Sequence, residues 1–91
     1  MVTVLVPGAL RVEAAGQSRL TVETAGTLAA VLDEVDARWP RLGRRIRDEQ
    51  GRLRRYVNVY VDGEDCRQTG GLATAVPPSA EVQVLPSVAG G

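Results

Sequence analysis

The last two residues of the sequence, Gly90 and Gly91, carry the group with the clearest chemical potential, the main-chain carboxylate of Gly91. Neither residue has a Cβ, so the backbone could thread a channel too narrow for other residues and bring that carboxylate to a partner enzyme. The alternative is a frayed terminus without a role, because chain ends are commonly disordered and tolerant of change. We expect residues 86–91 to form an extended, flexible tail after a folded domain of residues 1–85.

The side chains offer little catalytic chemistry. The chain has no histidine, its single cysteine is Cys66, and no GxxxxGK[ST] phosphate-binding loop occurs. One cysteine excludes an intramolecular disulfide and a thiolate metal cluster. Asp33, Glu34 and Asp36 could pair as catalytic carboxylates, but they are predicted on the solvated face of a helix, where charged residues usually lie. We expect no catalytic residue, no metal and no bound cofactor, and we interpret Cys66 as a structural residue at a strand end.

The charges cancel overall but are unevenly distributed along the sequence. Eleven cations balance eleven anions, every cation is an arginine, and eight arginines fall between Arg38 and Arg55. A net charge of zero supplies no global field that would attract the protein to nucleic acid or to an anionic membrane. The arginine-rich connector of residues 40–51 is either a solvated face or a surface that docks a partner. The absence of lysine removes every side-chain amine at which this chain could accept an isopeptide bond.

The N-terminal residues MVTVLVPGAL lack a basic segment followed by a long apolar one. No stretch approaches the roughly 20 apolar residues of a membrane span. We therefore expect a soluble cytoplasmic protein. We also expect it to be a monomer when free.

Alternating apolar residues predict four strands, at residues 2–6, 19–23, 57–61 and 81–85. Asp62-Gly63 is typical of a two-residue turn that folds the chain back after the third strand. Gly70-Gly71 predicts a sharp turn into a short helical turn. The residues expected to face the core are Val2, Val4, Val6, Leu20, Val22, Val57, Val59, Val61, Val82 and Val84.

One main helix is predicted between the second and third strands. Thr27 suits its N-cap, and Pro40 is expected to end it. The apolar face of the helix has the i, i+3, i+4, i+7 spacing: Leu28, Val31, Leu32 and Val35. Beyond it, Leu42 and Ile46 are expected to hold a short turn of helix against the body. One helix on one face of a mixed sheet would bury both apolar faces.

This order of elements, together with three motifs, resembles the ThiS/MoaD family of ubiquitin-like sulfur carriers. The motifs are VNVYVDGED from residue 57, GGLATAV from residue 70 and the final LPSVAGG. Within the family, the similarity points to the CysO type, which serves thiocarboxylate-dependent cysteine biosynthesis. The resemblance implies an α+β ubiquitin-like β-grasp fold, with one main helix packed on one face of a mixed sheet and a flexible Gly-Gly tail.

The resemblance also implies a reaction at the tail. It assigns Gly91 as the reactive residue and Gly90 as its required neighbour, with Ala89 and Val88 as the tail needed for activation. An ATP-dependent adenylating enzyme of the ubiquitin-activating type would join the carboxylate to AMP, and sulfide or a persulfide would then displace AMP and leave a thiocarboxylate. The sulfur would then pass to a sulfur-consuming synthase. The resemblance favours a PLP-dependent cysteine synthase for this role. Thiamine, molybdopterin and thio-containing natural products draw on the same kind of carrier.

Partner docking is expected on the sheet. If the alternating valines fill the core, Leu5, Tyr60 and Leu85 point outward near the tail, and clustered exposed apolar groups suggest docking. Arg54 and Arg55 would add charge steering. The alternative is scattered apolar surface residues, which are common. Two other functions remain open: a ubiquitin-like modifier that forms isopeptide bonds through the final glycine, and an arginine-rich binding module.

Overall fold

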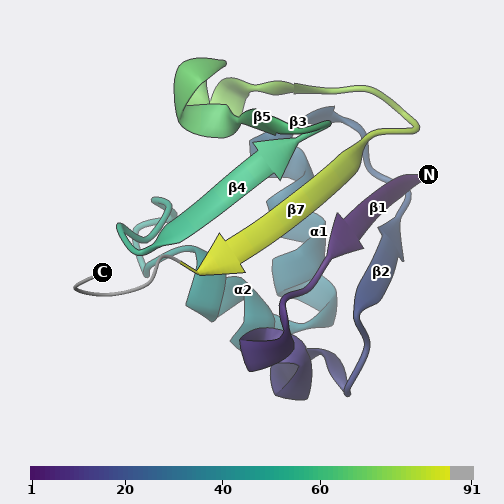
Figure 1. Cartoon of the computed structure of the whole chain (residues 1–91), viewed down its shortest axis with the longest axis vertical. Helices are drawn as coiled ribbons and strands as arrows, with labels where there is room; N and C mark the ends of the chain where they lie inside the picture. Colours follow the sequence, from purple (N-terminus) through teal and green to yellow (C-terminus); the bar gives the residue numbers. More distant parts are fainter. Residues whose placement is uncertain (87–91) are drawn as a thin grey trace.

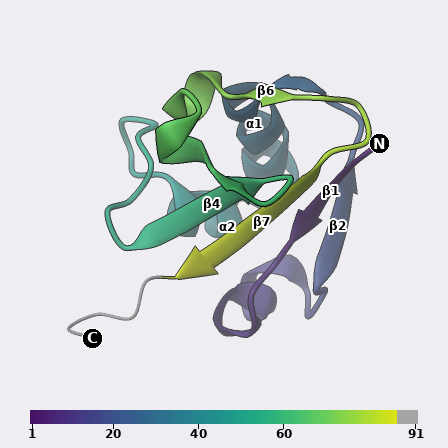
Figure 2. The ribbon, with the colours of Figure 1, turned by 45° about the horizontal axis from the view of Figure 1, so that its top comes forward.

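The computed structural model describes residues 1–86 as two layers, a mixed sheet and two helices (Figure 1). α1 (Leu28–Arg38) and the shorter α2 (Pro40–Ile46) pack behind the same face of the sheet, as the turned view in Figure 2 also shows. The other face of the sheet is left uncovered by helices. None of the helices in the described residues combines the length and the hydropathy that crossing a lipid bilayer requires.

The main sheet has five strands in the order β2-β1-β7-β4-β5. β7 (Glu81–Pro86) lies in the middle, parallel to β1 (Val2–Leu5) and antiparallel to β4 (Val57–Val61). β2 (Arg19–Val22) and β5 (Glu64–Asp65) form the two edges. Both pairs of strands that adjoin in sequence, β1 with β2 and β4 with β5, are antiparallel hairpins.

The core lies between the sheet and α1, and the alternation of apolar residues in the strands correctly predicted which side chains face it. All ten residues predicted to face inward from the strands are buried, at 6% exposure or less. The four apolar residues predicted on the helix face are buried opposite them. Apolar residues from both layers therefore form one continuous cluster that removes the hydrophobic face of each element from water.

The two ends of α1 show one confirmed prediction and one correction. Thr27 caps the helix, because its Oγ1 accepts a hydrogen bond from the Ala30 N–H at 3.2 Å. At the other end, α1 ends at Arg38, Trp39 separates the two helices, and Pro40 is the first residue of α2. Proline suits the first position of a helix because no intrahelical partner needs its missing N–H. Pro40 therefore starts a helix that was predicted only as a short turn.

The turn after β4 is the two-residue turn that the sequence predicts. Asp62 and Gly63 have φ values of 49° and 86°, and Glu64 pairs back with Val61. Two consecutive positive φ angles match the twist of a tight hairpin. The local Asp-Gly signal was sufficient to locate this reversal.

Two parts of the structure were not predicted. η1 (Gly8–Ala14), a 3-10 helix, occupies the segment between β1 and β2 and buries Leu10. β3 (Gly26–Thr27) and β6 (Ala75–Val76) pair as a separate two-stranded ribbon beside the start of α1 (Figure 2). Elements of two residues have no sequence period that could reveal them.

The segment between β5 and β6 contains two further 3-10 turns, η2 (Cys66–Gln68) and η3 (Gly71–Ala73). The second is the helical turn that Gly70-Gly71 predicted. Thr74 holds both turns together, since its hydroxyl lies 3.3 Å from the Cys66 carbonyl oxygen and 2.7 Å from the Gly71 carbonyl oxygen.

Candidate functional site

β7 leads to the predicted reactive segment. Its last residue, Pro86, lies opposite Val57 at the start of β4, so the strand continues one residue past the predicted domain boundary. Hydrogen-bonded neighbours on both sides hold β7 in the centre of the sheet. The predicted activation residues lie outside the described residues, and their roles stay predictions: Val88, Ala89, Gly90 and Gly91.

The three predicted docking residues lie on the sheet face away from the helices. Leu5 and Tyr60 each lie opposite Gln83, and Leu85 lies opposite Asn58. Leu85 is 38% exposed, and the other two apolar side chains are half-buried. Strands β1, β7 and β4 therefore bring together residues that are far apart in sequence, with Leu85 next to the end of β7 and Leu5 and Tyr60 beside its middle. Partner docking at these residues remains a prediction.

A hollow opens beside this face where β1 and β7 diverge. Leu5 and Leu85 line it, together with Arg11 from η1 and Arg19 from the start of β2. Arg11 is fixed there because its Nε donates to the Val6 carbonyl oxygen at 3.1 Å. The two arginines were missed from sequence. Arg11 lies in a 3-10 helix that carries no clear periodic signal, and Arg19 begins a predicted strand whose place beside β1 no local pattern specifies.

Arg54 and Arg55 lie at the same end of the sheet, just before β4. The Nε of Arg54 donates to the carbonyl oxygen of Arg44 at 2.7 Å, which fixes the position of its side chain. Arg55 is exposed, and the next residue, Tyr56, is 52% exposed. Because the first residue of β4 pairs with Pro86, these predicted steering residues do adjoin the end of β7.

Arg67 joins this region from η2. Its Nη1 donates to the Asn58 side-chain oxygen at 2.7 Å, and its Nη2 donates to the Val57 carbonyl oxygen, also at 2.7 Å. The guanidinium thereby fastens η2 to the start of β4. No sequence signal marks this residue, because the contact depends on how the chain returns after the β4–β5 turn.

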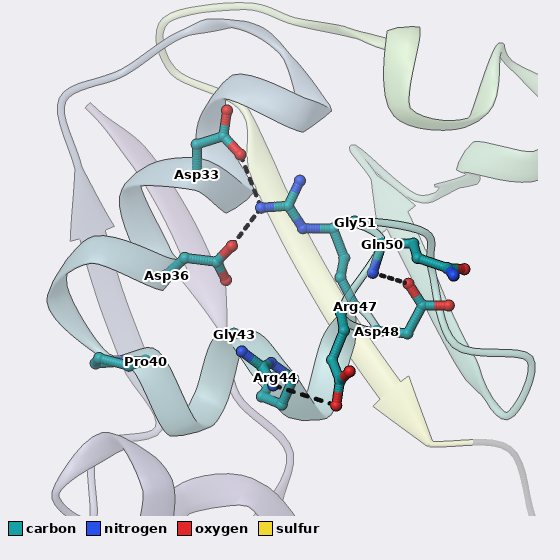
Figure 3. A pocket seen from close by; sticks show the side chains of 10 residues that line it. Asp33, Asp36, Pro40, Gly43, Arg44, Arg47, Asp48, Gln50 and Gly51 are labelled. Atoms are coloured by element: carbon teal, nitrogen blue, oxygen red, sulfur yellow. Dashed lines mark hydrogen bonds and ion pairs between the residues drawn. The ribbon is translucent and has the colours of Figure 1, made fainter.

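A second polar cluster lies between α1, α2 and the connector that follows them (Figure 3). Arg47 is only 7% exposed, and its Nη2 donates to Asp33 at 2.8 Å and to Asp36 at 2.5 Å. Burial by itself lowers the pKa of Arg47, but the hydrogen bonds and negative charges of the two carboxylates outweigh it and raise the pKa overall. Gly43 makes room for the cluster, since a Cβ there would lie 1.7 Å from Asp36 Oδ1.

The helix acids are therefore more than solvated charges. Asp33 stays mostly exposed, as predicted, but it and Asp36 neutralise a buried guanidinium. Glu34 accepts hydrogen bonds from the Thr24 hydroxyl at 2.5 Å and from its N–H at 3.0 Å, and the hydroxyl bond above all lowers the pKa of Glu34. These contacts tie α1 to its neighbours, so the acids have a structural role.

Cys66 is fully buried at the start of η2. Burial raises the pKa of its thiol, and the charge of Asp65 raises it further. The thiol is therefore protonated and shielded at neutral pH, in agreement with a structural residue. Nowhere in residues 1–86 do three or more His, Cys, Asp or Glu side chains gather as metal ligands would.

Comparison with known proteins gives matches along nearly the whole chain. The model of the ThiS family matches residues 4–91. The sulfur carrier protein CysO of Mycobacterium tuberculosis is 41% identical over 92 residues, covering 99% of this chain and 98% of that protein. The crystal structure of M. tuberculosis CysO has a TM-score of 0.88 at 39% identity, covering 97% of this chain and 100% of that one. The BexX/CysO complex of Amycolatopsis orientalis has a TM-score of 0.90 at 36% identity, with 100% of both chains covered. These likenesses confirm the ubiquitin-like β-grasp fold.

Proposed function

The chain belongs to the ThiS family, and from this membership we propose that it is a sulfur carrier that holds sulfur as a thiocarboxylate at Gly91. The observation that carries the proposal is the extent of the likeness. The family match continues to residue 91, and the identity to a sulfur carrier protein spans 99% of the chain. The Gly-Gly end is thus included in the similarity and is not an addition to an unrelated domain.

The chemistry requires a partner enzyme. A carboxylate is a poor electrophile, because its negative charge repels nucleophiles and oxide is a poor leaving group. Attack of the Gly91 carboxylate on the α-phosphorus of ATP forms an acyl adenylate and releases pyrophosphate. Sulfide or a persulfide sulfur then attacks the acyl carbon and displaces AMP; with a persulfide, reductive cleavage of the S–S bond by a thiol completes the step. The carrier ends with one sulfur in place of one carboxylate oxygen.

The chain itself contributes presentation and recognition. It contains no histidine, and its one cysteine is buried, so neither of these residue types supplies an accessible nucleophile or a base in residues 1–86. Instead, β7 is held by strands on both sides and ends at the sheet end that carries Leu5 and Leu85. An adenylating enzyme that grips this end would receive the reactive group at a defined distance from a rigid body.

Mass spectrometry of the intact carrier tests the proposal. Incubation with a ubiquitin-activating-type adenylating enzyme, ATP and a sulfur source should add the mass difference between sulfur and oxygen. Fragmentation should place that difference on the C-terminal residue, and alkylation should trap it, which separates it from oxidation of Met1 or Cys66. The matched control is the variant that lacks Gly91, which should gain nothing. Unchanged carboxylate in the complete reaction would refute the proposal.

Within the same proposal, we assign cysteine biosynthesis as the use of the sulfur, through a PLP-dependent cysteine synthase. The support is the 41% identity to CysO proteins over nearly the whole chain. Carrier labelled with a sulfur isotope should transfer the label to cysteine when the synthase is added. Transfer to a thiazole, a dithiolene or another thio product alone would exclude cysteine. Because activation consumes ATP, we expect both steps in the cytoplasm.

A further inference from the structure

Within residues 1–86, the ion pairs lie in the helical layer and its connector. Arg38 pairs with Glu34, and Arg47 pairs with two aspartates of α1. The connector adds two more pairs, Arg44 with Glu49 and Arg52 with Asp48. Charges in this layer are therefore partly neutralised locally, although Arg41 and Arg45 of α2 are exposed and form no ion pair within residues 1–86.

The two ends of the sheet differ from the helical layer. The end at which β7 terminates carries four guanidiniums that form no ion pair with a carboxylate of residues 1–86: Arg11, Arg19, Arg54 and Arg55. The opposite end, where β7 begins, carries four exposed carboxylates that likewise form no ion pair within the described residues: Glu23, Asp62, Glu64 and Glu81. We call the first set the arginine end and the second set the acidic end.

The topology produces this separation. β7 and β1 run in one direction, and β4 and β2 run in the other. The start of β2 (Arg19) and the residues before β4 (Arg54, Arg55) therefore lie at the end of the sheet where β7 terminates. Glu81 at the start of β7 meets the β4–β5 turn instead, where Asp62 Oδ1 accepts the Glu81 N–H at 2.9 Å. In Figure 1 the arrowhead of β7 marks the arginine end. A chain with zero net charge thus folds into a body with a positive and a negative end.

The distance between the two ends is large enough for a partner to experience the electric field of one end alone. The six residues of β7 span roughly 17 Å at about 3.3 Å per residue. This exceeds the Debye length of about 8 Å at physiological ionic strength. A protein that approaches the arginine end therefore meets a positive field that the distant carboxylates do not cancel.

We infer that the arginine end docks an acidic surface of the adenylating enzyme, and that the charge separation orients the carrier tail-first during encounter. The inference rests on the proposed function. Five residues separate Pro86 from the end of Gly91, a reach of at most about 17 Å. An enzyme that holds Gly91 must then place its own surface against the arginine end, and carboxylates are the groups that complement unpaired guanidiniums there. The acidic end would be repelled by the same surface.

The test is the rate of association with the purified adenylating enzyme, measured by stopped flow at low and physiological salt. Arg19→Glu with Arg55→Glu should slow association about tenfold at low salt and weaken the salt dependence. Both side chains are exposed, so the variant should fold, which circular dichroism verifies. The matched control adds Glu23→Arg and Glu64→Arg, which restores zero net charge but removes the charge difference between the two ends. It should associate as slowly as the double variant.

Three outcomes would overturn the inference. The first is that the double variant associates at the wild-type rate, and the second is that the control with restored net charge recovers the wild-type rate. The third is that the wild type self-associates in sedimentation experiments and the double variant does not. The last would show that the arginine end receives the acidic end of a second copy. Pyrophosphate exchange at saturating carrier keeps the two proposals separable. If the wild type is never adenylated, the proposed function fails, whereas adenylation with unaltered association rates refutes only the docking inference.

Discussion

Arg47 and Arg55 come from the same arginine-rich stretch and reach opposite environments. Arg47 is buried against α1, and two aspartates neutralise it. Arg55 is exposed beside the end of β7 and forms no ion pair in the described part of the chain. The comparison teaches that charge density along a sequence does not assign a role. The helical layer uses charge to hold the fold together, whereas the arginine end leaves its charges without ion pairs in residues 1–86, which is the basis of the docking inference.

Deleting Gly91 should have the largest effect. The reactive carboxylate would move to Gly90, so thiocarboxylate formation should be lost completely. Thermal stability should not change, because the buried core is built from residues between Val2 and Val84. Differential scanning calorimetry and intact mass on the same sample check both parts. A lower melting temperature would contradict the division between a structural body and a reactive tail.

The aspartates that neutralise Arg47 should matter for stability alone. Asp33→Asn with Asp36→Asn leaves the buried guanidinium without a counter-charge. The expected loss is about 2 kcal/mol in the free energy of unfolding, which is less than for a fully buried pair because both carboxylates are partly exposed. Urea denaturation measures it. At temperatures where the variant is folded, its rate of association with the adenylating enzyme should equal that of the wild type. A slower association would show that this cluster contributes to docking.

Truncating Leu85 should produce the reverse pattern. Leu85→Ala removes a partly exposed side chain next to the end of β7, so affinity for the adenylating enzyme should fall by about 1–2 kcal/mol, while stability changes little. Titration calorimetry gives the affinity. Val12→Ala is the matched control, because Val12 is more exposed and lies beside Trp39 on the helical side. Equal losses from both variants would show that exposed apolar area, and not this face, determines binding.

The smallest effect is a pH dependence from Glu34. The hydrogen bond from the Thr24 hydroxyl lowers the pKa of Glu34 in the folded protein below its ordinary value of 4.5. Its contribution to stability is therefore present above pH 4.5 and is lost as the pH falls through the lowered folded value. Glu34→Gln should be less stable than the wild type at pH 6, and the difference should shrink in acid. A difference that stays constant with pH would show that the contact does not depend on charge.

The sequence by itself determined the parts of this protein that are set by local signals. Alternating valines placed β4 and the sheet core, Thr27 fixed the start of α1, and the Asp62-Gly63 pair located a turn. Each signal acts within a few residues, through side-chain period, a capping hydroxyl or backbone conformation. The motifs that resemble a known family added the prediction that Gly91 is reactive, which no periodicity could have supplied.

Only the tertiary structure decided which charged residues are neutralised and which remain unpaired. Arg47 pairs with Asp33, fourteen positions away in the sequence. Arg11 reaches the hollow from the unpredicted η1, and Arg19 reaches it because β2 pairs with β1. Glu81 lies beside the β4–β5 turn because β4 and β7 are antiparallel. Such contacts depend on strand order and direction, which a local pattern does not encode. The physical reason is that charge acts through space, so its arrangement is defined only when distant segments have packed together.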